Sequence, residues 1–390
     1  MNILIVYDYL SGILEGGSDR ILYEHSKRLK ERGHTLKILT TGEKESYEND
    51  FFNKDIEIFR SRVSDSRFLR FFQTLWGTRK IFDQLTKDAK FDAINFHQPL
   101  SALPVLYHKK SKDLLTVYTF HSPWHLEYEI ENDSASILRG LNSLLRKRAE
   151  RFCLNRCDKI VVLSEYSSNM LIDIHGIDKD KISLIPGGID TEKFRPASSK
   201  AEVRKELSLP LDKFIIFSIR SLRRRTGLVE LISASRRILQ KDDNTLLVIS
   251  GGGPRRKEVE DLVEKSGLKS KVILTGFVPA DMLPLYYQAS DLFVMPTQKL
   301  EGFGLALLEA LSSGLPVLAT PVDAIPEVLS GLDKRCLFED ITEKSMAKGM
   351  EEVIADNEIR RKVTDKARTY VIARYSWNNI INRLERVFLG

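Results

Sequence analysis

Short apolar runs of strand length alternate with helical patterns along the whole chain, and this alternation constrains the fold more than any other feature. The runs are almost continuously apolar, which is typical of parallel strands buried on both faces. The expected strands are ILIVY (3–7), TLKILT (35–40), IEIF (56–59), DAINF (92–96), LTVYTF (115–120), KIVVLS (159–164), KISLIP (181–186), KFIIFSIR (213–220), TLLVIS (245–250), KVILTG (271–276), DLFVMP (291–296) and PVLAT (316–320). The pattern predicts an α/β protein with doubly wound, Rossmann-like sheets.

A stretch rich in Pro and Gly, IPGGIDTEKFRPASS (185–199), separates the strands into two sets. Neither the helical nor the strand period continues through it. A chain of 390 residues is also too long for one ordinary core. We therefore predict two facing Rossmann-like domains, 1–190 and 191–374, with a ligand cleft between them. The final helix, YSWNNIINRLERVF (375–388), would pack on either domain.

Composition predicts a cytoplasmic protein. Cys153, Cys157 and Cys336 do not form a disulfide framework. The first strand begins at residue 2, so we expect no signal peptide, and no apolar run reaches the length of a membrane span. The net charge of +6 and the isoelectric point near 9.0 favour a partner that carries phosphate, anionic lipid or nucleic acid.

Two segments combine basic and bulky apolar residues. SRVSDSRFLRFFQTLWGTRK (61–80) is interpreted either as an amphipathic helix that packs its apolar face or as a helix at a membrane surface or acceptor groove. Peripheral contact with the inner face of a membrane would follow from the second interpretation. For LRGLNSLLRKRAERF (138–152) we favour ordinary packing of the apolar face.

The stretch KLEGFGLALLEALSSGLPVLAT (299–320) places two acids around a helix start. Gly302 and Gly304 allow close approach of the backbone to a ligand, and the free N–H groups of a helix start favour phosphate. Glu301 precedes the helix and would accept hydrogen bonds from sugar hydroxyls. Glu309 lies within an apolar helix, where a buried carboxylate requires a polar partner such as a ribose. The alternative is that Glu301 only caps the helix and that Glu309 is an exposed helical residue, although its apolar neighbours disfavour full exposure.

Arginines gather in SIRSLRRRTG (218–227), directly after a strand. Arg220 and Arg225 lie at its two ends, and guanidinium groups bind phosphates through paired hydrogen bonds. The glycine-rich turn VISGGGPRR (248–256), which contains Gly252, is a weak signal alone. It has neither a P-loop lysine nor the spacing of a dinucleotide fingerprint.

The first half of the chain holds fewer candidates. Gly16 and Gly17, in EGGSDR (15–20), would let the backbone approach an anion. His121, in TFHSPWHLEYE (119–129), follows a strand and would face a ligand, although a lone histidine is also common as a structural residue. The sequence shows no metal-ligand spacing of His, Cys or Asp.

EGFGLALLEALSSGLPVLAT resembles the signature of glycosyltransferase family four (group 1), in which seven residues separate two glutamates. The chain is similar to this family over nearly its whole length, including the GG loop, TFHSPW, LSEYSS, IPGGIDTEKFRP, GGGP and the terminal YSW helix. Members have the GT-B fold and are retaining enzymes that use nucleotide sugars. The resemblance implies an acceptor-side domain completed by residues 375–390, and a nucleotide-sugar-binding domain over 191–374.

The resemblance also implies roles for individual residues. Glu301 would hold hydroxyls of the donor sugar, and His121 would lie beside the reacting sugar, so both are candidate catalytic residues. The diphosphate would be neutralised by Arg220 and Arg225, and the ribose bound by Glu309. The full set of candidate donor-binding residues is Gly16, Gly17, Arg220, Arg225, Gly252, Phe277, Gly302, Phe303, Gly304, Leu305 and Glu309.

Two departures from the family pattern stand out. Many members carry a Gly-Arg pair followed by a Lys, where this chain has Arg220-Ser221 and Thr226-Gly227, so the arginine that clamps the diphosphate is left open. Paired glycines are replaced by Asp323 and Ala324 in TPVDAIPEV.

The expected function is transfer of a hexose from a UDP-, GDP- or ADP-sugar to a hydroxyl acceptor, lipid-linked or part of an envelope glycan. No cofactor, metal or nucleic acid is expected. The alternatives are a nucleotide-sugar epimerase or phosphorylase on the same scaffold, and a non-catalytic protein that binds nucleotide sugar or anionic lipid.

Overall fold

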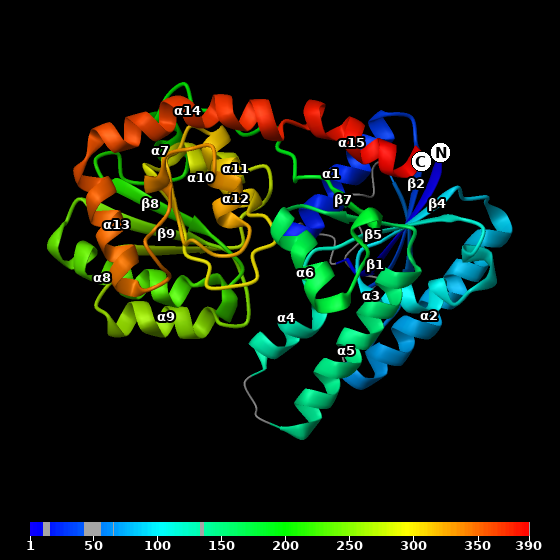
Figure 1. Cartoon of the computed structure of the whole chain (residues 1–390). Coiled ribbons are helices and arrows are strands. Elements are labelled where there is room, and N and C mark those ends of the chain that lie inside the picture. Colours follow the sequence, from blue (N-terminus) through cyan, green and yellow to red (C-terminus); the bar gives the residue numbers. More distant parts are fainter. Residues whose placement is uncertain (11–15, 43–55, 65, 133–135, 390) are drawn as a thin grey trace. The chain divides into compact units, whose positions relative to one another are not determined.

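The computed structural model describes residues 1–10, 16–42, 56–64, 66–132 and 136–389 (Figure 1). The chain divides into two compact units. Unit 1 consists of Met1–Pro186 and Ile380–Gly390, and unit 2 of Gly187–Asn379.

Unit 1 is built on a seven-stranded sheet with the order β3-β2-β1-β4-β5-β6-β7. All of its strand pairs are parallel. The strands are β1 (Asn2–Tyr9), β2 (Thr35–Thr41), β3 (Glu57–Ser61), β4 (Ala93–Phe96), β5 (Leu115–Thr119), β6 (Lys159–Val162) and β7 (Ile182–Leu184). Burial of five consecutive residues in β1 and of all four in β4 explains why these strands are continuously apolar.

The helices of unit 1 surround this sheet. They are α1 (Gly17–Glu31), α2 (Arg67–Asp88), α3 (Pro99–Leu106), α4 (Trp124–Glu131), α5 (Ile137–Arg156), α6 (Glu165–His175) and the larger part of α15 (Trp377–Leu389), with short 3-10 turns at Lys109–Ser111 and Lys179–Lys181. In α15, Glu385 binds Arg32 and His34, at 3.3 and 3.0 Å, and so holds the last helix against the region around the end of α1.

Unit 2 is built on a five-stranded parallel sheet with the order β10-β9-β8-β11-β12. The strands are β8 (Phe214–Ile219), β9 (Thr245–Ser250), β10 (Val272–Gly276), β11 (Leu292–Met295) and β12 (Val317–Ala319). The helices are α7 (Lys200–Glu206), α8 (Leu228–Lys241), α9 (Arg256–Lys265), α10 (Leu283–Ala289), α11 (Leu305–Ser312), α12 (Ile325–Leu329), α13 (Glu343–Ala355) and α14 (Asn357–Tyr375), with short 3-10 turns at Arg224–Thr226 and Lys334–Cys336.

Strand order reverses once in each sheet. In unit 1 the reversal lies between β1 and β4, and in unit 2 between β8 and β11. Loops that leave the carboxyl ends of such neighbouring strands diverge to opposite faces, and the opening between them is where open α/β sheets bind ligands. Ligand-binding residues are therefore expected in the segments that follow β1, β4, β8 and β11.

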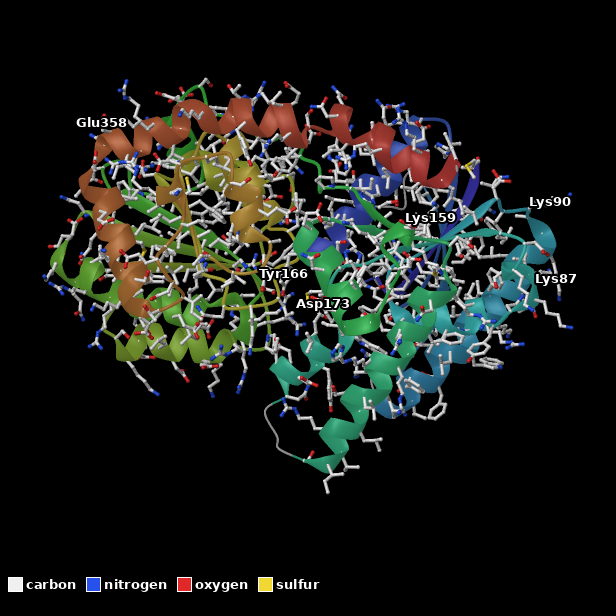
Figure 2. All side chains as sticks on the ribbon, viewed as in Figure 1. Lys87, Lys90, Lys159, Tyr166, Asp173 and Glu358 are labelled. Atoms are coloured by element: carbon white, nitrogen blue, oxygen red, sulfur yellow. The ribbon has the colours of Figure 1, made fainter. Side chains whose placement is uncertain are left out.

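The predicted α/β class and all the predicted strands are confirmed, with boundaries that differ by at most a few residues. The three cysteines are buried and free, as expected. Side chains fill the space between sheet and helices within each unit, whereas Lys87 and Lys90 project outward at the end of α2 (Figure 2).

The prediction for residues 138–152 is partly wrong. The first half of α5 leaves its apolar side chains exposed instead of packing them, with Ile137 at 92% and Leu138 at 77% exposure. In α2 the exposed apolar side chains include Phe72 and Trp76, so its apolar face is only partly packed. Within the described ranges, no helix offers an apolar stretch of the length and low charge that crossing a bilayer requires.

Candidate functional site

The two sequence motifs of unit 2 follow neighbouring strands. Leu292 and Phe293 of β11 lie beside Ile216 and Phe217 of β8, so the turn after β8 and the loop after β11 emerge next to each other. Gly227 lies where these segments meet. It adopts a left-handed conformation (φ +74°), and a Cβ atom there would lie 1.7 Å from the Pro296 carbonyl oxygen.

The candidate acid and the candidate phosphate clamp contact each other across this junction. The Arg220 Nη2 group donates a hydrogen bond to Glu301 Oε2, and both side chains are largely buried. Thr297 Oγ1 donates to the same carboxylate oxygen at 3.4 Å. Arg225 instead donates through Nη1 to the Leu300 carbonyl oxygen at 2.6 Å. One arginine therefore holds the Glu301 carboxylate and the other holds the backbone immediately before it.

The sequence departure at residues 323–324 lies directly on Glu301. The Glu301 backbone N–H donates to Asp323 Oδ2 at 2.9 Å, and Ala324 N–H donates to the Glu301 carbonyl oxygen at 3.3 Å. Leu300 and Asp323 both have φ near +55°, a strained conformation for residues other than glycine. The backbone N–H and carbonyl groups of Glu301 are therefore both hydrogen-bonded to residues 323–324, where this chain departs from the paired glycines of the family.

Helix α11 begins next to this acid. Gly304 is its N-cap, in a left-handed conformation (φ +91°), and Leu305 is its first residue. Gly302 and Phe303 complete the turn that leads to it. The first amides of the helix have no partners within the helix, and together with the helix dipole they form an environment that suits an anion.

Glu309 is buried in α11, with 4% of its surface exposed, as its apolar neighbours predict. One polar partner of Glu309 is Tyr287 of α10, whose hydroxyl group donates to Glu309 Oε2 at 2.7 Å. Sequence reasoning did not find Tyr287. The only signal was an aromatic residue with a polar tip within a short apolar helix, LPLYYQA.

The glycine-rich turn after β9 packs against the arginine segment. Leu222 N–H donates to the Gly252 carbonyl oxygen at 2.8 Å, and Gly251 N–H donates to the Gly276 carbonyl oxygen at 2.7 Å. Phe277, the next residue, exposes 44% of its surface. All the candidate residues of unit 2 thus belong to segments that leave the carboxyl ends of its strands or, for Glu309, to the helix that follows one.

The remaining candidates belong to unit 1. Gly16 is the N-cap of α1, and its backbone N–H donates to Asp19 Oδ2 at 3.1 Å. A Cβ atom on Gly17 would meet open space. The Tyr7 hydroxyl group donates to Asp19 Oδ1 at 2.6 Å, which ties the end of β1 to the start of α1.

His121 follows β5 and stacks on His97, which follows β4, with ring centroids 5.2 Å apart. Nδ1 of His97 and Nε2 of His121 lie 3.0 Å apart, so one nitrogen donates and the other accepts. Burial lowers the pKa of His121 to about 4 and holds the pKa of His97 well below its usual range. The pair is therefore uncharged at neutral pH.

Sequence reasoning missed both His97 and Asp8 at this edge of the sheet. Asp8 lies near the end of β1 and accepts a hydrogen bond from Ser101 N–H at 2.7 Å. Burial raises the pKa of the Asp8 carboxyl group. Both residues lie at the ends of β1 and β4, where the strand order reverses, and this position could have indicated them as candidate site residues.

Two family models match the chain. The model described as glycosyl transferases group 1 matches residues 199–370, and that described as glycosyltransferase family 4 matches residues 15–193. An uncharacterized glycosyltransferase of Methanocaldococcus jannaschii is 29% identical over 233 residues, which span 59% of this chain and 59% of that protein's length. The phosphatidylinositol N-acetylglucosaminyltransferase gpi3 subunit of Schizosaccharomyces pombe is 25% identical over 96% of this chain and 77% of its own length.

Solved structures show the same fold. The sucrose-phosphate synthase of Thermosynechococcus elongatus superposes with a TM-score of 0.84 at 20% identity, covering 100% of this chain and 98% of its own. Anabaena HepE, in complex with UDP and glucose, superposes with a TM-score of 0.81 at 18% identity, covering 100% and 99%. The chain has the GT-B fold and belongs to the group 1 glycosyltransferases of family 4, as its sequence signature predicted.

Proposed function

We propose that this glycosyltransferase moves a sugar from a nucleotide diphosphate sugar to a hydroxyl group of its acceptor, with retention of anomeric configuration. The observation that carries the proposal is the contact between Arg220 and Glu301 at the reversal of strand order in unit 2. In this contact a cation suited to phosphate meets an acid suited to sugar hydroxyls, four residues before the first residue of α11, and this supports the proposal.

Each part of the nucleotide sugar, namely the diphosphate, the sugar, the ribose and the base, has a proposed partner in unit 2. Arg220 and Arg225 would hold the diphosphate, with the α11 amides near Leu305. A guanidinium has five N–H donors, so Arg220 would bind phosphate without releasing Glu301. Glu301 would hold donor-sugar hydroxyls, and Glu309 the ribose. The base would lie near Phe277, with Gly252 allowing close approach of the backbone, and Gly302, Phe303 and Gly304 would supply amides.

The proposed reaction develops negative charge on the leaving diphosphate. The acceptor oxygen bonds to the anomeric carbon as the bond from that carbon to the phosphate oxygen breaks, on the same face of the sugar. The acceptor proton passes to the departing phosphate oxygen. Preorganised arginines and helix amides would stabilise this charge without a metal cofactor.

Unit 1 would serve the acceptor, with His121 beside the reacting sugar and Gly16 and Gly17 approaching the donor phosphate or the acceptor. Because the His97–His121 pair is neutral at pH 7, His121 would act as a hydrogen-bonding group and not as a fixed charge. The names of several relatives support a lipid acceptor, including a phosphatidylinositol monomannoside mannosyltransferase of Mycobacterium tuberculosis.

We also propose peripheral contact with a membrane. The exposed apolar side chains of α2 lie within the segment 61–80, and α5 presents a second exposed row. Both helices pack on α3. Apart from the buried Glu150, every charged residue of α5 is basic. Such a surface suits anionic lipid.

The donor is identified by a thermal-shift screen against UDP, GDP and ADP and their sugars, since a ligand that binds only the folded state raises the melting temperature. UDP is the first candidate, because HepE binds it. Nucleotide release with donor and an acceptor panel then tests transfer. Release that needs no acceptor, with an altered sugar as product, would instead indicate an epimerase.

A further inference from the structure

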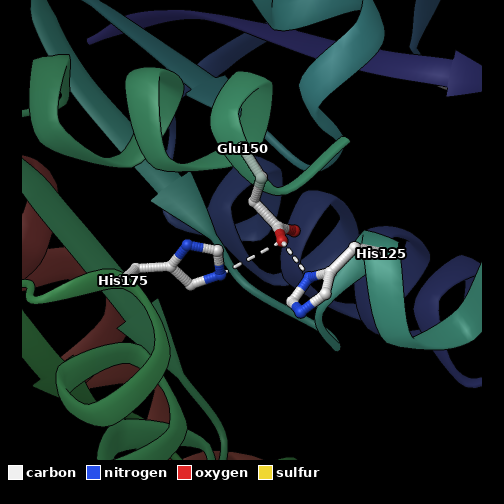
Figure 3. A group of neighbouring side chains, drawn as sticks. All are labelled: His125, Glu150 and His175. Atoms are coloured by element: carbon white, nitrogen blue, oxygen red, sulfur yellow. Dashed lines mark ion pairs between the residues drawn. The ribbon is translucent and has the colours of Figure 1, made fainter. Parts of the chain in front are cut away.

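Three potential metal ligands converge inside unit 1, and none of them is among the candidate residues described above. Figure 3 shows His125 of α4, Glu150 of α5 and His175 at the end of α6, with both imidazole rings directed at the carboxylate. His175 Nε2 lies 3.2 Å and His125 Nδ1 4.0 Å from Glu150 Oε2. All three ligand atoms lie within 4.8 Å of one another.

The cluster is closed to solvent and incompletely hydrogen-bonded. Glu150 and His175 expose 1% and 0% of their surface, and His125 is also buried. Three buried ring nitrogens have no hydrogen-bond partner within the part of the chain that the structure describes. They are Nδ1 and Nε2 of His175 and Nδ1 of His125. Native proteins rarely leave buried polar atoms in this state.

The carboxylate also needs positive charge. A buried, unpaired carboxylate costs several kcal/mol, and the described ion-pair partners of Glu150 are the two histidines. A cation held by all three side chains would neutralise the carboxylate and also give a partner to His175 Nε2 and His125 Nδ1.

We propose that His125, Glu150 and His175 form a structural site for a divalent transition metal, with Zn²⁺ as the ion that the ligands suit best. Two imidazoles and one carboxylate are a common zinc ligand set, with a fourth position left for water. Bonds of about 2.0–2.2 Å around a tetrahedral ion separate the ligand atoms by about 3.3–3.6 Å. The 3.2 Å separation is close to this range, and the 4.0 Å separation exceeds its upper end by about 0.4 Å.

The carboxylate already has the support expected of a metal ligand. Trp124 N–H donates to both oxygens of Glu150, at 3.2 and 3.1 Å, and hydrogen bonds of this kind fix ligating carboxylates. Trp124 is the first residue of α4 and lies three positions after His121. A metal here would join α4, α5 and α6 and hold the start of α4 beside the His121 segment.

The spacing of the sequence did not suggest this site. The ligands come from three helices and lie far apart along the chain, so no short motif contains two of them. Only the packing of α4 against α5, together with the end of α6, brings them into reach.

The test uses the full-length chain with any affinity tag removed. The protein is stripped with a chelator, titrated with Zn²⁺ or Co²⁺, and examined by elemental analysis and visible absorption. We expect about one equivalent of metal per chain and the intense d–d bands of four-coordinate Co²⁺. A wild-type chain that binds less than a tenth of an equivalent, or whose Co²⁺ spectrum is that of the hydrated ion, overturns the proposal.

Variants locate the bound metal. His175→Gln and Glu150→Gln should each weaken Co²⁺ binding by about tenfold or more. The matched control is His34→Gln, which alters another buried histidine–glutamate pair of unit 1 and should leave binding unchanged. Equal loss in this control contradicts the assignment. If a ligand variant does not fold, the wild-type titration decides alone. No sugar donor is present, so a negative result leaves the proposed transfer untouched.

Discussion

Arg220 and Glu301 form an ion pair that joins the turn after β8 to the loop after β11. Each side chain exposes only 12% of its surface. A cation and an acid of the candidate site therefore position each other. A pair of this kind should act as a unit, because removing either member leaves the other buried and uncompensated.

We predict that Arg220→Ala and Glu301→Ala each lower the rate of transfer by about 100-fold or more, as loss of one preorganised charge commonly does. The double variant should be little worse than either single variant, because groups that act together are not additive. Nucleotide release in the presence of donor and acceptor measures all three.

The matched control for these variants is Arg224→Ala, an exposed arginine of the same cluster, which should retain transfer. Turnover like that of the wild type in Glu301→Ala would remove its proposed role. Full additivity of the two losses would show that the residues act separately.

The buried carboxylate of Glu309 yields a second prediction. Tyr287→Phe removes the hydroxyl group that donates to Glu309 and should lower the free energy of unfolding by about 1.5–3 kcal/mol, the usual contribution of a hydrogen bond to a charged group. Urea denaturation gives the value. The neighbouring Tyr286→Phe serves as the control, and an equal loss there would show that the effect is not specific to Glu309.

The sequence predicted the strands well, because strands buried on both faces leave a continuous apolar signal. It also predicted that Glu309 is buried, from its neighbours alone. It did not find Tyr287, His97 or the partners of Glu150, since such contacts arise between elements distant in the chain. The exposed row on α5 was misjudged for a related reason. Helical periodicity shows that an apolar face exists, but only packing shows whether a neighbour covers it.

Gly227 allows a test of the junction between the two motifs. Gly227→Ala would place a Cβ atom against the Pro296 carbonyl oxygen in a left-handed conformation, so we expect loss of stability greater than about 1 kcal/mol and loss of donor binding. Thermal denaturation without nucleotide measures the loss of stability, and the shift in melting temperature when nucleotide is added measures donor binding. Gly140→Ala, in the open face of α5, should instead be neutral or stabilising, and equal behaviour of the two variants would contradict this explanation.

Acid should destabilise the protein through its buried histidines. Burial lowers the pKa of His121 to about 4 and that of His25 to about 3, against an ordinary value of 6.5. Below pH 6.5 the unfolded chain binds protons that the folded chain refuses, so stability is complete above this pH and is lost as the pH falls toward 4. His121→Gln should make this decline shallower in urea denaturation series. Ser122→Ala, a neighbouring change that does not titrate, should not. An unchanged slope in His121→Gln would contradict the prediction.

The exposed rows on α2 and α5 should bind anionic vesicles together. Insertion of a large apolar side chain contributes about 1.5 kcal/mol or more when complete, and each basic residue near an anionic surface adds about 1 kcal/mol. We expect the chain to float with vesicles that contain phosphatidylglycerol and not with pure phosphatidylcholine.

Two variants test the two rows separately. One replaces Phe71, Phe72 and Trp76 of α2 by serine, and the other replaces Leu138 and Leu145 of α5 by serine. Each variant should reduce flotation, and a variant that carries all five substitutions should abolish it. Leu211→Ser, which alters an exposed apolar residue of unit 2, provides the control. If the combined variant floats like the wild type, these rows have another partner.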